Sequence, residues 1–158
     1  MNESRLNVAI DRFLMARPFY ACCLLVHHEI RVLEQACAYL TSRYRWPMVS
    51  IGTVLGEALQ DVEHTRRPNA SFTVLSQAIQ VHVSGPVLCT DSDILFEPSL
   101  HLDPLRLLRE TSRVAPLIVT WAGGYDGGVL TYATANPLHA HYRAWRNPGL
   151  CEDCIVVL

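Results

Sequence analysis

Apolar and polar positions follow one another along this chain in blocks whose spacing changes between the two periods of regular secondary structure. Residues 2–17 place apolar side chains three and four positions apart, which predicts an amphipathic helix. Residues 19–26 form an unbroken apolar run, which is typical of a strand buried on both faces of a sheet. Helical spacing returns in residues 28–44. The chain is therefore predicted to open with a helix, a strand and a second helix.

The same alternation continues along the next ninety or so positions, where Asp103 and Pro104 are a favourable N-cap and first-turn residue. The further elements expected are strands at residues 48–51, 86–91, 116–121 and 128–133 and helices at residues 52–61, 72–83 and 104–113. Residues 63–70 are predicted to be a loop, and the glycine-rich residues 123–128 a turn between two strands. Strands alternating with helices predict an α/β fold with a mostly parallel sheet and helices on both faces.

Composition sets the size and setting of this fold. A chain of 158 residues, 50% hydrophobic and with a formal net charge of −2, is expected to form a single domain over residues 1–158, with residues 134–158 as a loosely ordered tail. No apolar stretch has the length of a membrane span, and charged residues interrupt the first helix, so we expect a cytoplasmic protein without membrane contact. The near-neutral charge disfavours a broad basic field for nucleic acid.

The six cysteines divide into two groups. Four of them lie inside predicted strands or helices and are expected to be reduced core residues: Cys22, Cys23, Cys37 and Cys89. The other two form a CxxC pair, Cys151 and Cys154, preceded by His139 and His141. These four nitrogen and sulfur ligands match the number in a structural zinc site, and the pair alone matches a redox motif. The spacing is not that of a standard zinc finger, so a structural or loose tail without zinc is the expectation.

Acidic residues follow the apolar run at residues 86–90. A buried parallel strand that ends in Asp91 has the form of a Walker B strand, in which the carboxylate faces a magnesium-phosphate group, and Asp93 would be the nearby acid. Thr120, expected at the end of a neighbouring strand, would be a sensor residue for the γ-phosphate. Many buried strands instead end in an Asp that caps the following turn.

Two segments extend this pattern: ILFEPSLHLDPLRLLRETSR, and LIVTWAGGYDGGVLTYA after it. Their wording, in residues 95–113 and 118–133, resembles the BrxF family, the small P-loop proteins of type 3 bacteriophage-exclusion (BREX) defence systems. The resemblance implies a P-loop NTPase fold of the RecA/AAA-like type. It also implies partners among the other BREX proteins, namely the large ATPase, the phosphatase-like subunit and the methyltransferase. The first half of the chain resembles the family only in its strand-helix rhythm.

The phosphate-binding loop that such a fold uses is missing. The loop needs glycines whose N–H groups wrap the phosphates, a Lys, and a Ser or Thr for the metal. All 13 Lys and Arg residues of this chain are Arg, and the first glycine is Gly52. The place of the loop is taken by bulky or acidic residues, with Leu33 and Glu34 where Lys and Ser/Thr are expected: His27, His28, Glu29, Leu33 and Glu34. The resemblance therefore implies a decayed Walker A site, and no cofactor is expected.

Arginines offer the remaining candidate surface. Arg106, Arg109 and Arg113 fall on one face of the predicted helix, which is either a solvated face or a contact for an acidic partner. The preferred interpretation is a pseudo-ATPase that acts as an accessory or scaffolding subunit of an antiviral defence complex. One alternative is a slow ATPase that binds MgATP through Asp91 and Asp93. Another is a nucleic-acid-binding module that uses these arginines with Arg66-Arg67. DNA contact through the complex and homo-oligomerisation stay open.

Overall fold

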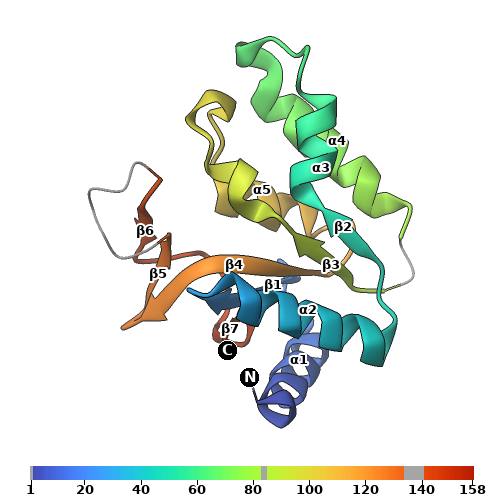
Figure 1. The fold of residues 1–158 in the computed structure, drawn as a ribbon, viewed down its shortest axis with the longest axis vertical. Coiled ribbons are helices and arrows are strands. Elements are labelled where there is room, and N and C mark those ends of the chain that lie inside the picture. Colours follow the sequence, from blue (N-terminus) through green and yellow to red (C-terminus); the bar gives the residue numbers. More distant parts are fainter. Residues whose placement is uncertain (1, 83–84, 134–140) are drawn as a thin grey trace.

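A parallel sheet runs through the centre of the computed structural model, which describes residues 2–82, 85–133 and 141–158 (Figure 1). Its strands lie in the order β2-β3-β4-β1-β7, and each neighbouring pair is parallel. Their bounds are β1 (Cys22–His27), β2 (Met48–Ser50), β3 (Val87–Thr90), β4 (Leu117–Asp126) and β7 (Ile155–Val157). The predicted α/β class is confirmed, and this strand order is consistent with a P-loop NTPase of the RecA/AAA-like type.

Two antiparallel strands extend the sheet beyond the carboxyl end of β3. The second half of β4 pairs with β5 (Val129–Tyr132), which pairs with β6 (Arg143–Trp145). Gly127 and Gly128 form the turn between β4 and β5 with positive φ angles of 53° and 79°. The predicted glycine turn was too long, because Gly123 and Gly124 belong to β4. A side chain at Gly123 would collide with the backbone carbonyl of Thr131 on β5, so this glycine permits the close approach of the two strands.

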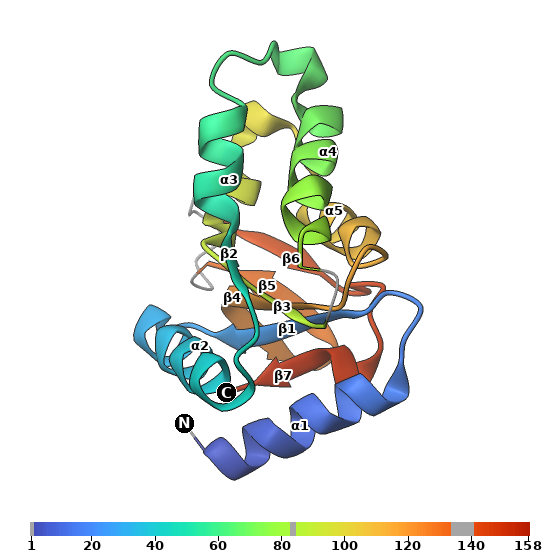
Figure 2. The ribbon, with the colours of Figure 1, turned by 90° about the vertical axis from the view of Figure 1, so that its right-hand side faces the viewer.

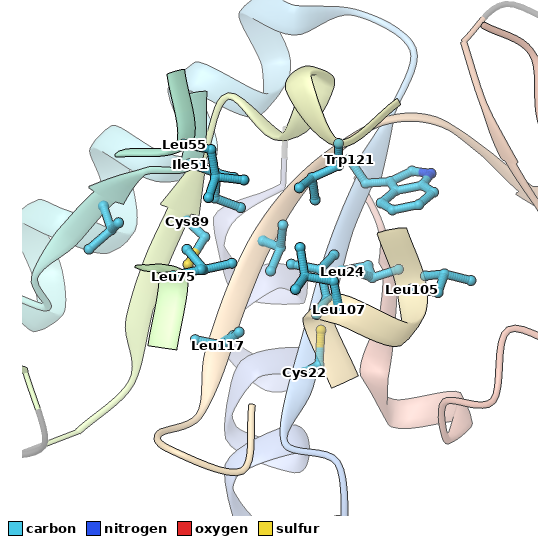
Figure 3. Close-up of a cluster of buried hydrophobic side chains, with 14 of the residues drawn as sticks. Cys22, Leu24, Ile51, Leu55, Leu75, Cys89, Leu105, Leu107, Leu117 and Trp121 are labelled. Atoms are coloured by element: carbon cyan, nitrogen blue, oxygen red, sulfur yellow. The ribbon is translucent and has the colours of Figure 1, made fainter. Parts of the chain in front are cut away.

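Helices cover both faces of the parallel strands (Figure 2). On one face lie α1 (Glu3–Ala16) and α2 (Ile30–Tyr44); on the other lie α3 (Ile51–Ala58), α4 (Arg67–Gln80) and α5 (Pro104–Thr111). Side chains alternate along β1, so that Cys23 and Leu25 pack in the first layer and Cys22, Leu24 and Val26 in the second. Figure 3 shows the second layer. Burial on both sides explains the unbroken apolar run.

Local signals set most helix starts. The Asp103 side chain accepts a hydrogen bond from the Arg106 N–H at 3.1 Å, and Pro104 opens α5, as predicted. The predicted loop at residues 63–70 was wrong, because Pro68 occupies the first turn of α4, where its missing N–H costs nothing. A 3₁₀ turn at His64–Arg66 precedes it. The predicted first strand at residues 19–26 began too early: Phe19 is 76% exposed, and β1 starts at Cys22.

The C-terminal segment differs from the expected loose tail. Its described part, residues 141–158, supplies β6 and β7, and Val156 of β7 pairs with Leu25 of β1. A 3₁₀ turn at Glu152–Cys154 precedes β7 and packs Cys154 into the layer under α1. These strands have three residues each, too few to show a period in the sequence. In the described ranges, no helix is both long enough and apolar enough to cross a membrane.

The four core cysteines are free and buried, as predicted. Burial raises the pKa of the Cys22 thiol to about 12 and that of the Cys37 thiol to about 11. Burial raises the pKa of the Cys23 and Cys89 thiols as well. These thiols are therefore protonated near neutral pH and act as small hydrophobic residues.

Candidate functional site

A cavity of about 540 Å³ lies beside α2, at the carboxyl end of β3 and next to the middle of β4. Ligands of open α/β sheets bind at this edge, and the volume lies within the range of small-molecule pockets. Much of the lining is apolar and comes from α2, including Leu33 and Cys37, with Ala122 from β4. The polar part of the lining includes Glu34 from α2 and both predicted acidic residues, Asp91 and Asp93. The structure therefore brings the predicted acids together with the helix that follows β1.

Asp91 directly follows β3, as the sequence predicted, and has a left-handed backbone with φ 54°. Its Oδ2 accepts hydrogen bonds from the Ser50 hydroxyl at 2.5 Å and from the Thr90 hydroxyl at 3.0 Å. Ser50 is also the N-cap of α3 and accepts a bond from the Thr53 N–H at 3.1 Å. A Cβ at Gly52 would lie 3.1 Å from the Asp91 Cβ, so a glycine suits this close approach. Asp91 thus ties the end of β3 to the start of α3.

Asp93 is held by a residue that sequence reasoning missed. The Tyr132 hydroxyl on β5 donates a hydrogen bond to Asp93 Oδ1 at 2.5 Å. Burial, and then the bond to the Asp93 carboxylate, raise the pKa of Tyr132, so its hydroxyl is a donor near neutral pH. The Tyr132 ring stacks on Phe96 with 3.3 Å between ring centroids. The sequence carries no signal for this pair, because the two residues are 39 positions apart and meet only through the β4–β5 hairpin.

Thr120 lies within β4 and not at a strand end as predicted, because β4 continues to Asp126. The pairing of Cys89 with Val119 places Thr120 level with the end of β3, where it lines the cavity. Its hydroxyl donates to the Cys89 carbonyl at 3.4 Å, and its own carbonyl accepts a bond from the buried Ser92 hydroxyl at 2.8 Å. These bonds join the turn after β3 to β4, which gives Thr120 a structural role.

The connection between β1 and α2 consists of His28 and Glu29 alone. The Glu29 N–H donates to His27 Nδ1 at 2.9 Å, so a side chain already satisfies one of the few amides at this turn. Leu33 is buried among core residues, and Glu34 adds a carboxylate to the cavity. Among the described lining residues there is no Arg or His, and the chain contains no Lys. The residues present therefore do not fit MgATP, which needs a backbone cradle and cationic partners.

The predicted arginine face is engaged within the chain. Arg106 forms an ion pair with Glu110 at 2.9 Å on the exposed side of α5. Arg109 Nη1 donates to the Pro148 carbonyl at 3.2 Å, and its guanidinium lies 5.7 Å from the Tyr20 ring centroid. The Arg113 guanidinium lies 5.6 Å from the centroid of the Phe19 ring. Arg109 of α5 therefore contacts the segment before β1. The prediction that Arg113 shares this helix was wrong, because α5 ends at Thr111; Arg113 follows the helix and contacts the same segment.

Arg66-Arg67 is the second basic segment that the sequence offers to nucleic acid. Arg66 is exposed at the end of the 3₁₀ turn, whereas Arg67 donates from Nε to the Val62 carbonyl at 3.0 Å. The hydrogen bond from Arg67 stabilises the turn that leads into α4.

The CxxC pair is joined as a disulfide between Cys151 and Cys154, with Cα atoms 5.2 Å apart. In the described part of the chain, no group of three or more His, Cys, Asp or Glu side chains is arranged to hold a metal. His139 of the proposed ligand set lies outside the described residues, and His141 lies within them. While the disulfide is intact, neither sulfur is a thiolate that could bind zinc.

No protein-family model, curated protein or solved structure matches this chain. The resemblance of residues 95–113 and 118–133 to the BrxF family therefore stays a prediction from the sequence. What is established is an α/β fold with an acidic and apolar cavity at the carboxyl edge of its parallel sheet.

Proposed function

We propose that this protein is a non-catalytic accessory subunit of a BREX-like antiviral defence complex, a pseudo-ATPase whose P-loop-type fold binds partner proteins. The observation that carries the proposal is the connection between β1 and α2, where His28 and Glu29 alone replace a phosphate-binding loop. Two residues cannot arrange a ring of backbone N–H groups around a triphosphate. Without that ring the nucleotide loses its main source of binding energy.

Charge in the cavity opposes nucleotide binding further. A phosphate charge about 4 Å from one carboxylate costs roughly 4 kcal/mol at an effective dielectric constant of 20. A charge-assisted hydrogen bond returns on the order of 1.5–3 kcal/mol. The cavity lining carries Glu34, Asp91 and Asp93 without a basic residue among its described members, so repulsion outweighs attraction. This balance disfavours a slow ATPase that binds MgATP through Asp91 and Asp93.

The two segments that resemble BrxF pack against each other. Phe96 of the first stacks on Tyr132 of the second, and its ring centroid lies 5.2 Å from that of Trp121. All three rings belong to one buried cluster. An aromatic core that both segments build supports a fold related to BrxF. It also gives these two segments a packing role that does not depend on a nucleotide site. The partners that we propose are the large ATPase, the phosphatase-like subunit or the methyltransferase of the complex, with DNA contacted through them.

Exposed apolar side chains around the cavity support a role in protein binding. Ile30 of α2 and Met48 of β2 both line the cavity and are each 58% exposed. Apolar residues that surround a hollow are typical of interaction sites more than of free surface. The same edge that would hold nucleotide in an active ATPase is thus suited to a protein contact.

Two measurements test the proposal. In titration calorimetry we expect MgATP to bind with a dissociation constant of about millimolar or weaker. The described cavity lining has neither a loop of backbone N–H groups for the phosphates nor a basic side chain. A low-micromolar dissociation constant that is lost on Asp91→Ala would replace the proposal with the slow ATPase. In an affinity pull-down from a host with the neighbouring defence genes, we expect stoichiometric recovery of one of the three named BREX proteins. Recovery of none of them would contradict the accessory role.

A further inference from the structure

The cavity beside α2 combines an apolar lining with an acidic rim. Glu34 comes from α2, and Asp91 and Asp93 come from the end of β3 and the turn after it. All three side chains belong to exposed residues. Arg106 and Glu110 form an ion pair elsewhere, on α5, and neither residue lines the cavity. Among the described lining residues there is no cation to neutralise the charge of this rim.

Each aspartate is held in place and still has an oxygen to offer. Asp91 uses Oδ2 for the Ser50 and Thr90 hydroxyls, and Asp93 uses Oδ1 for Tyr132. These bonds fix the carboxylates before any ligand arrives, which lowers the entropic cost of binding. The negative charge of Asp91 acts on the cavity lining. Burial is the main cause that raises the pKa of the Cys37 thiol to about 11, and the Asp91 charge is the second cause. Fixed acids above an apolar floor favour a ligand that is both cationic and partly apolar.

Two observations of a different kind point to an occupant. The apolar side chains of Ile30 and Met48 are exposed where they line the cavity. Thr41 also lines it, and the buried hydroxyl of Thr41 has no hydrogen-bond partner in the described part of the chain. An unsatisfied buried hydroxyl is uncommon in native proteins, and the hydroxyls of Ser76 and Thr111, which do not line the cavity, are two more in this chain. The Thr41 hydroxyl is thus a polar atom that a ligand in the cavity could satisfy, and the exposed apolar side chains carry the argument. A single small cation would satisfy the acids and leave the apolar side chains uncovered.

We propose that this cavity anchors an arginine side chain from a short segment of a partner protein, with apolar residues on either side of that arginine. The planar guanidinium has five N–H donors that can reach carboxylates on separate elements, and its alkyl stem can pack on Leu33 and Cys37. The flanking apolar residues cover Ile30 and Met48. Buried arginines are frequent energetic centres of protein interfaces. The inference rests on the proposed accessory function and names the chemistry by which a partner is recognised.

A direct test uses the peptide acetyl-Leu-Arg-Leu-amide as the probe, followed by ¹H–¹⁵N NMR of the full chain. We expect shifts of the Glu34, Asp91 and Asp93 amide signals, and binding at least tenfold weaker for the Glu34→Gln/Asp93→Asn variant. Glu57→Gln removes an exposed acid outside the cavity and is the matched control, for which binding should be unchanged. The amides are nearly isosteric with the acids, so folding is preserved, and the dispersion of the NMR spectrum verifies it.

Further probes separate the possible occupants. Acetyl-Leu-Gln-Leu-amide keeps the apolar groups without the charge and should bind at least tenfold more weakly; equal binding would overturn the proposal. Arginine methyl ester is the small cation, and binding as strong as that of the peptide would assign the cavity to small amines instead. If the arginine peptide shifts none of the NMR signals of the cavity residues, the proposal is also overturned.

The pull-down separates this inference from the proposed function. If the Glu34→Gln/Asp93→Asn variant still recovers the wild-type partner in full, the cavity is not its anchor while the accessory role stands. If the wild-type chain recovers no defence protein, the accessory role fails. Loss of the partner from the cavity variant, but not from Glu57→Gln, supports both.

Discussion

The ends of β1 and β3 lie on the same edge of the sheet and differ in how their polar residues are used. After β3, Asp91 is held by the Ser50 and Thr90 hydroxyls and Asp93 by Tyr132, so side chains of β2, β5 and β3 itself converge on two acids. After β1, the chain turns directly into α2, and the one side-chain bond of the turn is local, from Glu29 to His27. In a P-loop NTPase both ends serve the nucleotide. Here the end of β3 is a structural joint made by these hydrogen bonds, which explains its polar residues without any phosphate.

The largest effect should come from the aromatic cluster that supports the end of β3. Phe96 is 1% exposed and packs against Tyr132 and Trp121. We expect Phe96→Ala to lower the free energy of unfolding by about 3–5 kcal/mol through lost burial and a cavity, measured by urea denaturation. Phe19→Ala is the control, because that ring is 76% exposed; its cost should be below about 1 kcal/mol. Similar losses for both variants would show that the cluster does not support this joint.

Removal of the joint itself should have a smaller effect. Asp91→Ala deletes the acceptor of two hydroxyls and leaves a non-glycine residue at φ 54°. We expect a loss of about 1–3 kcal/mol in the free energy of unfolding. Glu29→Ala, at the end of β1, should change stability by less than about 0.5 kcal/mol, since its side chain forms no cap bond.

The contrast can fail in a definite way. If Glu29→Ala destabilises the chain as much as Asp91→Ala does, the two strand ends are equally structural. Asp91 would then have no structural role at the end of β3 beyond that of Glu29 at the end of β1. Asp91→Gly adds a finer control, because glycine accepts the left-handed backbone and isolates the cost of the lost hydrogen bonds.

Sequence reasoning reached the features that depend on near neighbours. The apolar run of β1, the acid after β3 and the Asp103 cap follow from residues within a few positions, and all three are present. Contacts across the fold could not be predicted in this way. Ser50 reaches Asp91 from 41 positions away, and nothing in either segment specifies the pair.

Short elements and strand lengths were the other difficulty. β6 and β7 have three residues each, and their stability comes from the strands beside them instead of from a period of their own. Gly123 and Gly124 resemble a turn in sequence, yet they continue β4, because β5 packs too close to allow a side chain at Gly123. That extension also moved Thr120 from a strand end to the interior of a strand.

A pH dependence links the two strand ends through Cys37, and the contribution of Asp91 to it is the smallest effect that we expect. This thiol lies on α2, the helix that follows β1, and Asp91 at the end of β3 adds to burial in raising its pKa to about 11 from an ordinary value of 9.0. Between these values the unfolded chain loses the proton while the folded chain keeps it. The contribution of the Cys37 thiol to the free energy of unfolding is therefore fully present below pH 9. It falls as the pH rises toward 11, by about 1 kcal/mol per pH unit.

Urea denaturation between pH 7 and pH 10.5 measures this slope, and Cys37→Ala should make it shallower than in the wild-type chain. Asp91→Asn retains the shape of the joint and removes its charge, so the Cys37 pKa should fall and the loss of stability through this group should end at a lower pH. An unchanged profile in Asp91→Asn would mean that the charge at the end of β3 does not reach the helix after β1. The field of the acidic rim would then be confined to its own strand end, and an arginine placed between α2 and Asp91 would gain little from the two together.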